Sequence, residues 1–267
     1  MTIPNVLTIA GSDPSGGAGI QADLKAFSAM KVYGASVITA LTAQNTQAVT
    51  GVHDVPPAFI TAQLDAVLSD LDIAAVKIGM LSQPEVIEVV ASALERHAVR
   101  TIVLDPVMVA KSGDDLLQPE AVDTLKHRLL PMATVITPNL PEAGVLLGAQ
   151  APADEDSMVQ AAEALRDLGA SAVLMKGGHL TGEICVDLLV DEGGVTRYAS
   201  TRIHTENTHG TGCSLSSAIA AALAHGMALP EAVREATRWL GGAIKSADDL
   251  QVGHGHGPVH HFHQLWG

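Results

Sequence analysis

Short apolar segments rich in β-branched residues alternate with amphipathic segments along most of the chain. Residues 5–10 carry the sequence NVLTIA and predict a buried strand, and the pattern of residues 20–30 predicts a helix directly after it. The alternation then predicts strands over residues 35–42, 74–81, 101–108, 133–139 and 171–179, and helices over residues 57–71, 82–96, 140–147 and 231–246. This order predicts an α/β fold of three layers, with helices on both faces of one mostly parallel sheet.

Two further segments add detail to this pattern. Residues 183–190 and 195–203 alternate polar and apolar positions and predict a pair of antiparallel strands. Ser82 and Glu85 have the spacing of a capping box for the helix that ends at Arg96. No repeat of about 20–50 residues and no low-complexity linker interrupts the chain, so we expect a single domain over residues 1–267.

The composition of the chain limits which partners the protein is expected to bind. The net charge is −14, with 29 acidic against 15 basic residues, which disfavours binding to nucleic acids or anionic membranes. Aromatic residues make up only 3% of the chain, so aliphatic side chains must build the core. The N-terminus lacks the pattern of a signal peptide, and no apolar run is long enough to span a membrane. We therefore expect a soluble, cytoplasmic protein.

The cysteines and histidines leave two questions for the structure. Cys185 and Cys213 are too few and too far apart for a disulfide scaffold or a zinc site, and Cys185 is expected to be a core thiol on a strand. Five histidines lie within residues 253–263. They are either a metal-binding tract or part of a tail that docks onto the domain, and the lack of a neighbouring carboxylate or cysteine favours docking.

The segment Asn207–Cys213 is the strongest candidate for chemistry. Gly210 and Gly212 allow a tight turn, and an alanine-rich helix begins directly after it. The free N–H groups and the positive dipole end of that helix would form a site for an anion such as phosphate. Cys213 lies at the helix start, where the pKa of a thiol is lowered, and could act as nucleophile or base. The alternative is a glycine turn that only caps a core helix.

Polar residues follow several predicted strands, and the carboxyl ends of parallel strands meet at one edge of a sheet. The first strand runs into a glycine-rich loop over residues 11–19, whose spacing matches neither a dinucleotide-binding loop nor a Walker A loop. Gln44, Met80 and Asp105 follow later strands at the same edge. Gln44 could read the edge of a heterocycle, and Asp105 could hold a metal-bound water, but either could also belong to an ordinary turn.

Four more polar residues near this edge are candidates for the site. Asn139 and Glu142 are three residues apart across a helix start, so they could bind Mg²⁺ or form a capping box, and both readings can hold together. Lys176 ends a strand beside two glycines and could contact a nucleotide phosphate. Asp23 lies on the helix after the glycine-rich loop, where its simplest role is to complement the helix dipole.

Several motifs taken together resemble the ribokinase-like superfamily, and within it the bacterial hydroxymethylpyrimidine/phosphomethylpyrimidine kinases of thiamine biosynthesis. The motifs are AGSDPSGGAG at residues 10–19, TPNLPE at 137–142, MKGGH at 175–179 and GTGC at 210–213. The resemblance covers essentially the whole chain, including GPVHHFH at residues 257–263. It implies a ribokinase-like fold, ATP and Mg²⁺ as cofactors, a small aminopyrimidine as substrate, and a homodimer.

The resemblance also implies roles for single residues. The anion hole for the transferred phosphoryl group would be formed by Gly210, Thr211, Gly212 and Cys213. The nucleotide side would be lined by Lys176, Thr208, Gly212 and Asn139, and the residues acting with Mg²⁺ would be Asn139, Glu142 and Asp105. The aminopyrimidine would be surrounded by Gly11, Asp23, Gln44, Met80 and Val107.

The implied reaction transfers the γ-phosphoryl group of ATP to the hydroxymethyl group of 4-amino-5-hydroxymethyl-2-methylpyrimidine, and then phosphorylates the monophosphate. Cys213, as a thiolate, would take the hydroxyl proton in the first transfer. The second acceptor is a phosphate that is already ionised, so we expect Cys213→Ala to slow the first transfer more than the second. The alternatives are a pyridoxal kinase, which makes a single transfer to another ring, and a non-catalytic vitamin-binding module.

Overall fold

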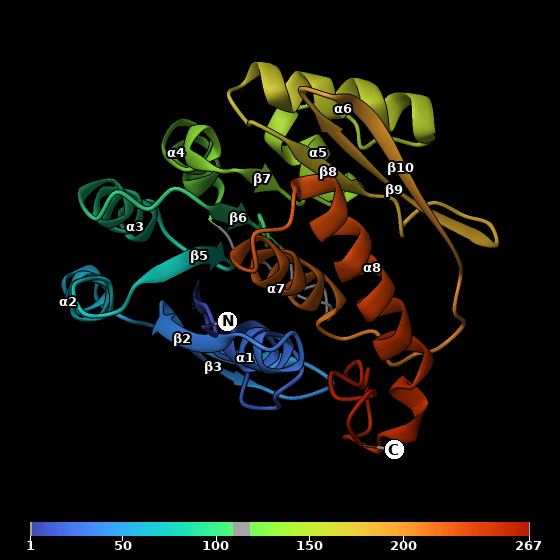
Figure 1. Cartoon of the computed structure of the whole chain (residues 1–267), viewed down its shortest axis with the longest axis horizontal. Helices are drawn as coiled ribbons and strands as arrows, with labels where there is room; N and C mark the ends of the chain where they lie inside the picture. Colours follow the sequence, from blue (N-terminus) through green and yellow to red (C-terminus); the bar gives the residue numbers. More distant parts are fainter. Residues whose placement is uncertain (1, 109–117, 267) are drawn as a thin grey trace.

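A computed structural model describes residues 2–108 and 118–266 (Figure 1). Its centre is an eight-stranded sheet with the order β10-β9-β8-β7-β6-β5-β1-β2. The strands are β1 (Asn5–Ala10), β2 (Tyr33–Ile38), β5 (Ile73–Ile78), β6 (Ile102–Leu104), β7 (Val135–Ile136), β8 (Val173–Lys176), β9 (Ile184–Asp191) and β10 (Gly194–Thr201). The strands from β2 to β8 in the sheet order are parallel, whereas β9 and β10 continue the sheet antiparallel. The mostly parallel sheet and the antiparallel pair are both confirmed.

Helices cover both faces of this sheet. One face carries α1 (Gly19–Ala29), α7 (Thr211–Ala224) and α8 (Leu229–Lys245), and the other carries α2 (Pro57–Leu68), α3 (Pro84–Arg96), α4 (Pro119–Arg128), α5 (Leu140–Leu147) and α6 (Glu155–Asp167). Along β1, Val6 packs into the core on the α7 side and Leu7 into the core on the other side. Two short helical turns, η1 (Leu130–Met132) and η2 (Ala247–Asp249), complete the helices. The three-layer α/β fold is therefore confirmed.

The predicted strand over residues 35–42 is wrong in one respect, because it is two strands. β2 ends at Ile38, and β3 (Ala40–Gln44) leaves the main sheet to pair antiparallel with β4 (Val49–Asp54). At the break, the N–H of Thr39 donates to the carbonyl of Ala10 at 3.0 Å, and its hydroxyl donates to the carbonyl of Met80 at 2.9 Å. These bonds turn the chain out of the sheet and place Gln44 on a separate hairpin.

The two predicted capping boxes have opposite outcomes. Ser82 does not cap α3, because its hydroxyl donates to Asp54 at 2.7 Å and the N-cap position is occupied by Gln83. Asn139 does cap α5, and Glu142 completes the box.

In the part of the chain that the structure describes, no helix is long and apolar enough to cross a membrane.

Candidate active site

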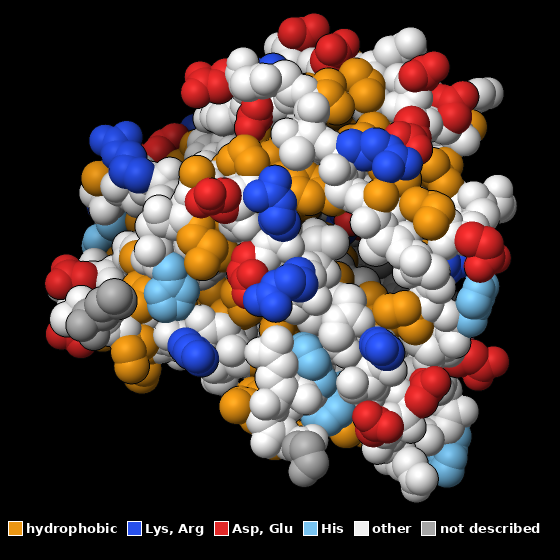
Figure 2. All heavy atoms as spheres, turned by 45° about the vertical axis from the view of Figure 1, so that its right-hand side comes forward, with side chains coloured by type: hydrophobic (Ala, Val, Ile, Leu, Met, Phe, Trp, Pro, Cys, Tyr) orange, Lys and Arg blue, Asp and Glu red, His pale blue; other side chains and the backbone are white. Residues whose placement is uncertain are grey.

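One cavity of 1220 Å³ opens at the carboxyl ends of the parallel strands. Among its lining residues are Gly11, Gln44, Met80, Asp105, Val107, Asn139, Glu142, Lys176, Thr208, Gly210, Thr211, Gly212 and Cys213. The fold thus brings together every predicted site residue except Asp23. Basic and acidic side chains are interspersed over the face shown in Figure 2, without one dominant basic patch.

The turn before α7 has the open N–H groups expected of an anion site. Gly210 is the N-cap residue with a φ of +77°, and a Cβ there would collide with the carbonyl oxygen of Gly17, so glycine is required. Ser214 N–H donates to the Gly210 carbonyl at 2.9 Å. Within the described residues, the N–H groups of Gly212 and Cys213 have no protein acceptor. Two donors and a helix N-terminus therefore face the cavity.

Cys213 differs from its expected state. Burial raises the pKa of its thiol to about 11, although Lys77 and the N–H of Gly19 act in the opposite direction. The lowered pKa predicted from the helix position is therefore wrong, because loss of hydration outweighs the favourable charges. At neutral pH, Cys213 presents a neutral thiol to the cavity.

Lys176 is held beside this turn by two acidic residues. Its Nζ lies 3.0 Å from Oδ1 of Asp105 and 3.9 Å from Oε2 of Glu142. A Cβ at Gly212 would lie 3.3 Å from the same Nζ, so the ammonium group and the turn face a common space. Burial alone would lower the pKa of Lys176, but Asp105 and Glu142 raise it above its usual value. A fixed positive charge thus adjoins the anion site.

Asp105 is a structural anchor for that lysine. Its carboxylate is 1% exposed and also accepts the hydroxyls of Thr137 at 3.0 Å and Ser216 at 3.2 Å. Burial alone would raise the pKa of Asp105, but Lys176 and Lys77 lower it. The carboxylate is therefore charged and fully hydrogen-bonded.

Asn139 and Glu142 bind each other. Glu142 N–H donates to Oδ1 of Asn139 at 2.9 Å, and Asn139 N–H donates to Oε2 of Glu142 at 2.7 Å. Burial raises the pKa of Glu142 to about 7, against the influence of Lys176. Among the described residues, no group of three or more histidine, cysteine, aspartate or glutamate side chains could hold a metal ion. This donor set fits Mg²⁺ only through waters and nucleotide phosphate oxygens.

Asp23 has a different position from the one expected. Both of its oxygens lie 2.9 Å from Nζ of Lys77, and it also accepts the hydroxyls of Thr8 at 2.6 Å and Ser217 at 2.7 Å. It is fully buried, lies beyond the first turn of α1, and is absent from the cavity lining, whereas Lys77 lines the cavity. Neither the substrate contact nor the dipole role matches this geometry. A lysine within the apolar segment 74–81 was the signal for a buried acidic partner.

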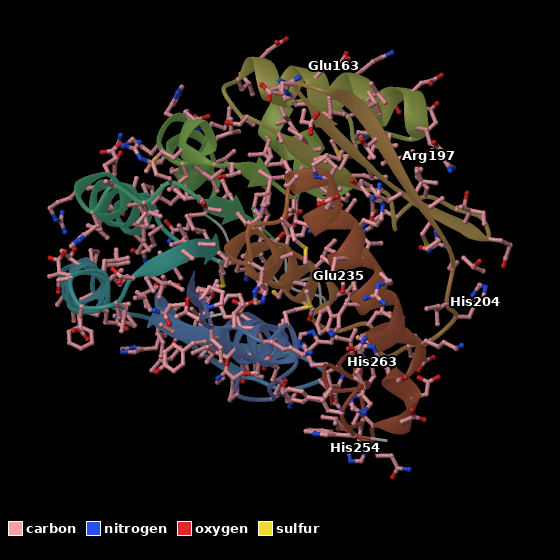
Figure 3. The ribbon with its side chains drawn as sticks, viewed as in Figure 1. Glu163, Arg197, His204, Glu235, His254 and His263 are labelled. Carbon is pink, nitrogen blue, oxygen red and sulfur yellow. The ribbon has the colours of Figure 1, made fainter. Side chains whose placement is uncertain are left out.

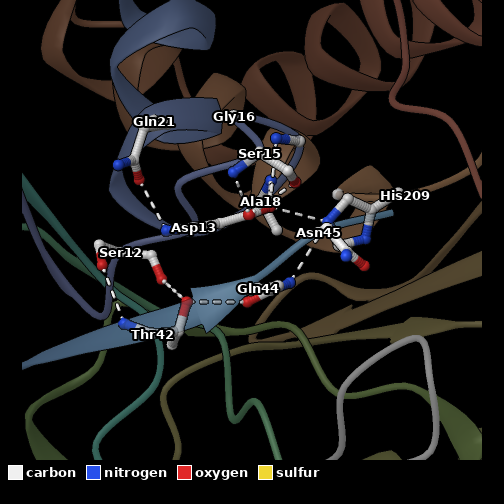
Figure 4. A network of polar contacts seen from close by, with 12 residues as sticks. Ser12, Asp13, Ser15, Gly16, Ala18, Gln21, Thr42, Gln44, Asn45 and His209 are labelled. Atoms are coloured by element: carbon white, nitrogen blue, oxygen red, sulfur yellow. Dashed lines mark hydrogen bonds and ion pairs between the residues drawn. The ribbon is translucent and has the colours of Figure 1, made fainter. Parts of the chain in front are cut away.

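Figure 4 shows a second polar network that the sequence analysis missed. Asp13 is 1% exposed, and its carboxylate accepts from Nε2 of His209 at 2.8 Å and from the N–H of Ala18 at 2.8 Å. Burial would raise the pKa of Asp13, but His209 and the other donors lower it to about 2. Nε2 of Gln44 lies 3.5 Å from the His209 ring, and its Oε1 accepts from Thr42 at 3.2 Å. The network joins the glycine-rich loop, the anion turn and the hairpin.

The structure also shows where Cys185 lies. Cys185 is half-buried and lines the cavity, so its expected place in the core is wrong.

The tail packs onto the domain through His260 and His261, which are each 4% exposed. Figure 3 shows His254 and His263 at separate places. The docking interpretation of the tail is therefore confirmed.

The fold and cavity define the class of protein. The structure matches that of an ADP complex of Bacillus subtilis pyridoxal kinase with a TM-score of 0.92 and 37% identity, over 100% of both chains. It also matches a phosphomethylpyrimidine kinase from Clostridium difficile with a TM-score of 0.81 and 47% identity, over 91% of this chain and 100% of the other. The protein therefore has the ribokinase-like fold of small-molecule kinases.

Sequence comparison then defines the family. The phosphomethylpyrimidine kinase profile matches residues 13–260. The hydroxymethylpyrimidine/phosphomethylpyrimidine kinase of Escherichia coli is 54% identical over 262 residues, which cover 98% of each chain. The chain belongs to the phosphomethylpyrimidine kinase family, and it is a kinase.

Proposed function

We propose that this protein phosphorylates 4-amino-5-hydroxymethyl-2-methylpyrimidine twice, first at the hydroxymethyl oxygen and then at the resulting monophosphate. The proposal rests on the N–H groups of Gly212 and Cys213, which have no acceptor among the described residues and lie beside the ammonium group of Lys176. Phosphoryl transfer depends mostly on positioning and on charge stabilisation, and these groups supply both. Residues 1–267 would act as one kinase domain.

In each transfer, an acceptor oxygen forms a bond to the γ-phosphorus of ATP while the bond to the β–γ bridging oxygen breaks and ADP leaves. In the first transfer, we infer that Cys213 is not the base, because the pKa of its thiol is raised to about 11, mainly by burial, and the thiol is neutral at pH 7. The loose transition state needs little prior deprotonation, so the proton leaves late, to a phosphoryl oxygen or to water. Cys213 then contributes its N–H and the shape of the cavity wall.

The nucleotide would bind with its phosphates near Lys176, Thr208 and Gly212. ADP in a similar structure supports a nucleotide site in this fold. Mg²⁺ would neutralise negative charge on the nucleotide phosphates. Asp105 and Glu142 would accept hydrogen bonds from its bound waters, because both carboxylates line the cavity beside Lys176.

The aminopyrimidine would bind beside Gly11, Gln44, Met80 and Val107. A Cβ at Gly11 would lie 2.7 Å from the Met80 methyl group, so glycine keeps this part of the cavity open. The Gln44 amide offers both a donor and an acceptor, which suits the neighbouring ring nitrogen and amino group of an aminopyrimidine. Asp23 would act from beneath the cavity through Lys77, rather than by direct contact.

The second candidate is a pyridoxal kinase, because the Bacillus subtilis enzyme has the same fold with a TM-score of 0.92. The 54% identity to the Escherichia coli pyrimidine kinase favours the first candidate. A non-catalytic module is disfavoured because Lys176, Gly212 and Cys213 all line the cavity. A cytoplasmic homodimer that binds neither nucleic acids nor membranes is part of the proposal and rests on the family resemblance and the net charge of −14.

Product analysis tests this proposal. The protein is incubated with MgATP and the hydroxymethylpyrimidine, with pyridoxal in a parallel reaction, and mono- and diphosphates are separated by anion exchange. We expect the pyrimidine monophosphate first and the diphosphate second. Monophosphate without diphosphate, or turnover of pyridoxal alone, would contradict the proposal and favour a single-transfer kinase.

A further inference from the structure

The C-terminal tail, residues 253–263, folds back onto segments that build the cavity. Figure 1 shows this tail in red beside the end of α8. Its backbone binds the turn between β3 and β4, where the N–H groups of Gly255 and His256 donate to Oγ1 and the carbonyl of Thr46, at 3.1 Å and 2.9 Å. A Cβ at Gly255 would collide with the Thr46 carbonyl, so the approach is close. Thr46 is two residues beyond Gln44.

The same tail binds the segment that leads into the anion site. Gly257 N–H donates to Oδ1 of Asn207 at 3.0 Å, and the N–H of His209 donates to the Gly257 carbonyl at 3.0 Å. A parallel β-bridge joins His209 to Pro258. The tail therefore connects the hairpin that carries Gln44 with the turn that begins at Gly210.

His261 reaches the anion site through one intermediate side chain. Its Nε2 lies 2.9 Å from the hydroxyl of Ser214, which donates to the carbonyl of Gly210 at 2.7 Å. The His261 ring is 4% exposed and packs against Trp239, with the ring centroids 6.2 Å apart. Burial lowers its pKa to about 3, and the nearby charges of Lys25 and His260 add to the effect. A neutral imidazole at a fixed position thus holds the hydroxyl that orients the Gly210 peptide.

We propose that His261, on the C-terminal tail, is a positioning residue of the active site, which acts through Ser214 on the Gly210 carbonyl. The N–H groups of Gly212 and Cys213 follow that carbonyl in the first turn of α7. Their direction toward a phosphoryl group therefore depends on how firmly the Gly210 peptide is held. The consequence for turnover rests on the proposed kinase function.

The kinetic test compares His261→Ala with His254→Ala. His254 is an exposed tail residue whose hydrogen bond to Thr46 uses only its backbone N–H, so alanine keeps that bond. Removing one oxyanion donor typically lowers kcat by about 100-fold or more. A change in the direction of the Gly212 and Cys213 N–H groups keeps both donors, so it should lower kcat by about tenfold. We expect this loss in His261→Ala, with KM for the pyrimidine changed by less than about twofold, and none in His254→Ala.

A double-mutant cycle separates positioning from general destabilisation. Ser214→Ala should reproduce the kcat loss, and the double variant should be no slower than either single variant, because both interrupt one connection. Parental kcat in a folded His261→Ala variant would overturn the proposal. Additive losses in the double variant would also overturn it.

A measurement without turnover keeps this proposal separate from the kinase assignment. Equilibrium dialysis with radiolabelled inorganic phosphate measures binding at the turn directly. His261→Ala should raise the free phosphate concentration that half-saturates the protein, whereas His254→Ala should not. An unchanged concentration in His261→Ala would contradict the positioning role, even if the parent protein fails to phosphorylate the pyrimidine.

Discussion

Cys213 illustrates how burial can reverse an expectation that is based on position in a helix. Its N–H group is one of the two open donors, but burial raises the pKa of its thiol to about 11. A helix N-terminus lowers the pKa of a thiol only while the thiolate stays hydrated or paired, and here desolvation is the larger effect. In the proposed reaction, Cys213 therefore contributes its backbone N–H group rather than its sulfur.

Because the Cys213 thiol is neutral, we expect a different outcome for Cys213→Ala from the one that a thiolate base implies. Alanine keeps the backbone N–H and removes a thiol that is neutral at pH 7, so the two transfers should slow by similar factors. Single-turnover assays of each transfer, with the hydroxymethylpyrimidine and with its monophosphate, measure those factors. A first transfer that slows about tenfold more than the second would restore the thiolate as base.

Lys77 and Asp23 form an ion pair in which both side chains are 0% exposed. Lys77→Met would leave the Asp23 carboxylate buried without its counter-charge, and we expect a loss of about 3–5 kcal/mol in the free energy of unfolding. The double variant Lys77→Met/Asp23→Leu removes both charges and should recover most of this loss. Urea denaturation measures both. Equal destabilisation of the single and double variants would show that side-chain packing, and not charge pairing, dominates.

At the scale of single elements, the sequence predicted helices and strands correctly where nearby residues alone determine the structure. The helix over residues 140–147 and its Asn139 cap occur as predicted. Ser82 has the same three-residue spacing to an acidic residue, but its hydroxyl binds Asp54 on the β3–β4 hairpin. Spacing alone cannot distinguish a cap from a tertiary hydrogen bond, because the competing partner is distant in sequence.

The β3–β4 hairpin shows the same limit for strands. Residues 35–42 have the composition of one strand, yet Thr39 binds the carbonyl groups of Ala10 and Met80 and redirects the chain. No local preference predicts this turn, because both acceptors, at Ala10 and Met80, belong to other segments. The hairpin is nevertheless what carries Gln44 to the cavity.

At the scale of the whole molecule, the sequence predicted which strand ends would meet, because parallel strands place their carboxyl ends together. It did not predict which polar residues would hold one another there. Lys77 with Asp23, Asp13 with His209, and His261 with Ser214 pair residues that are far apart along the chain. Such pairs depend on the packing of the complete fold.

His261 also makes the stability of the whole molecule depend on pH. Burial lowers its pKa from 6.5 to about 3, so below pH 6.5 the unfolded chain binds a proton that the folded protein excludes. The free energy of unfolding should therefore fall as pH decreases, by up to about 2 kcal/mol between pH 7 and pH 5 from this residue. Glu142 opposes this trend, because burial raises its pKa to about 7 and the folded protein gains a proton first.

The difference between the parent and His261→Gln isolates the histidine contribution, since Glu142 is common to both. Urea denaturation at pH 7 and pH 5 should show a smaller decrease for the variant. The same decrease in both proteins would contradict a buried neutral His261.

In the proposed reaction, one anion site, built from the start of α7 and Lys176, serves both phosphoryl transfers. Gly212→Ala tests it most directly, because a Cβ there would lie 3.3 Å from Nζ of Lys176, in the space assigned to the phosphoryl group. Gly51→Ala is a matched control, since its Cβ would make an ordinary 3.7 Å contact with Ala43 on the hairpin. In single-turnover assays, both transfers should slow by about 100-fold in a folded Gly212→Ala variant and remain unchanged in the control. A Gly212→Ala protein that performs either transfer at the parental rate would contradict a shared anion site.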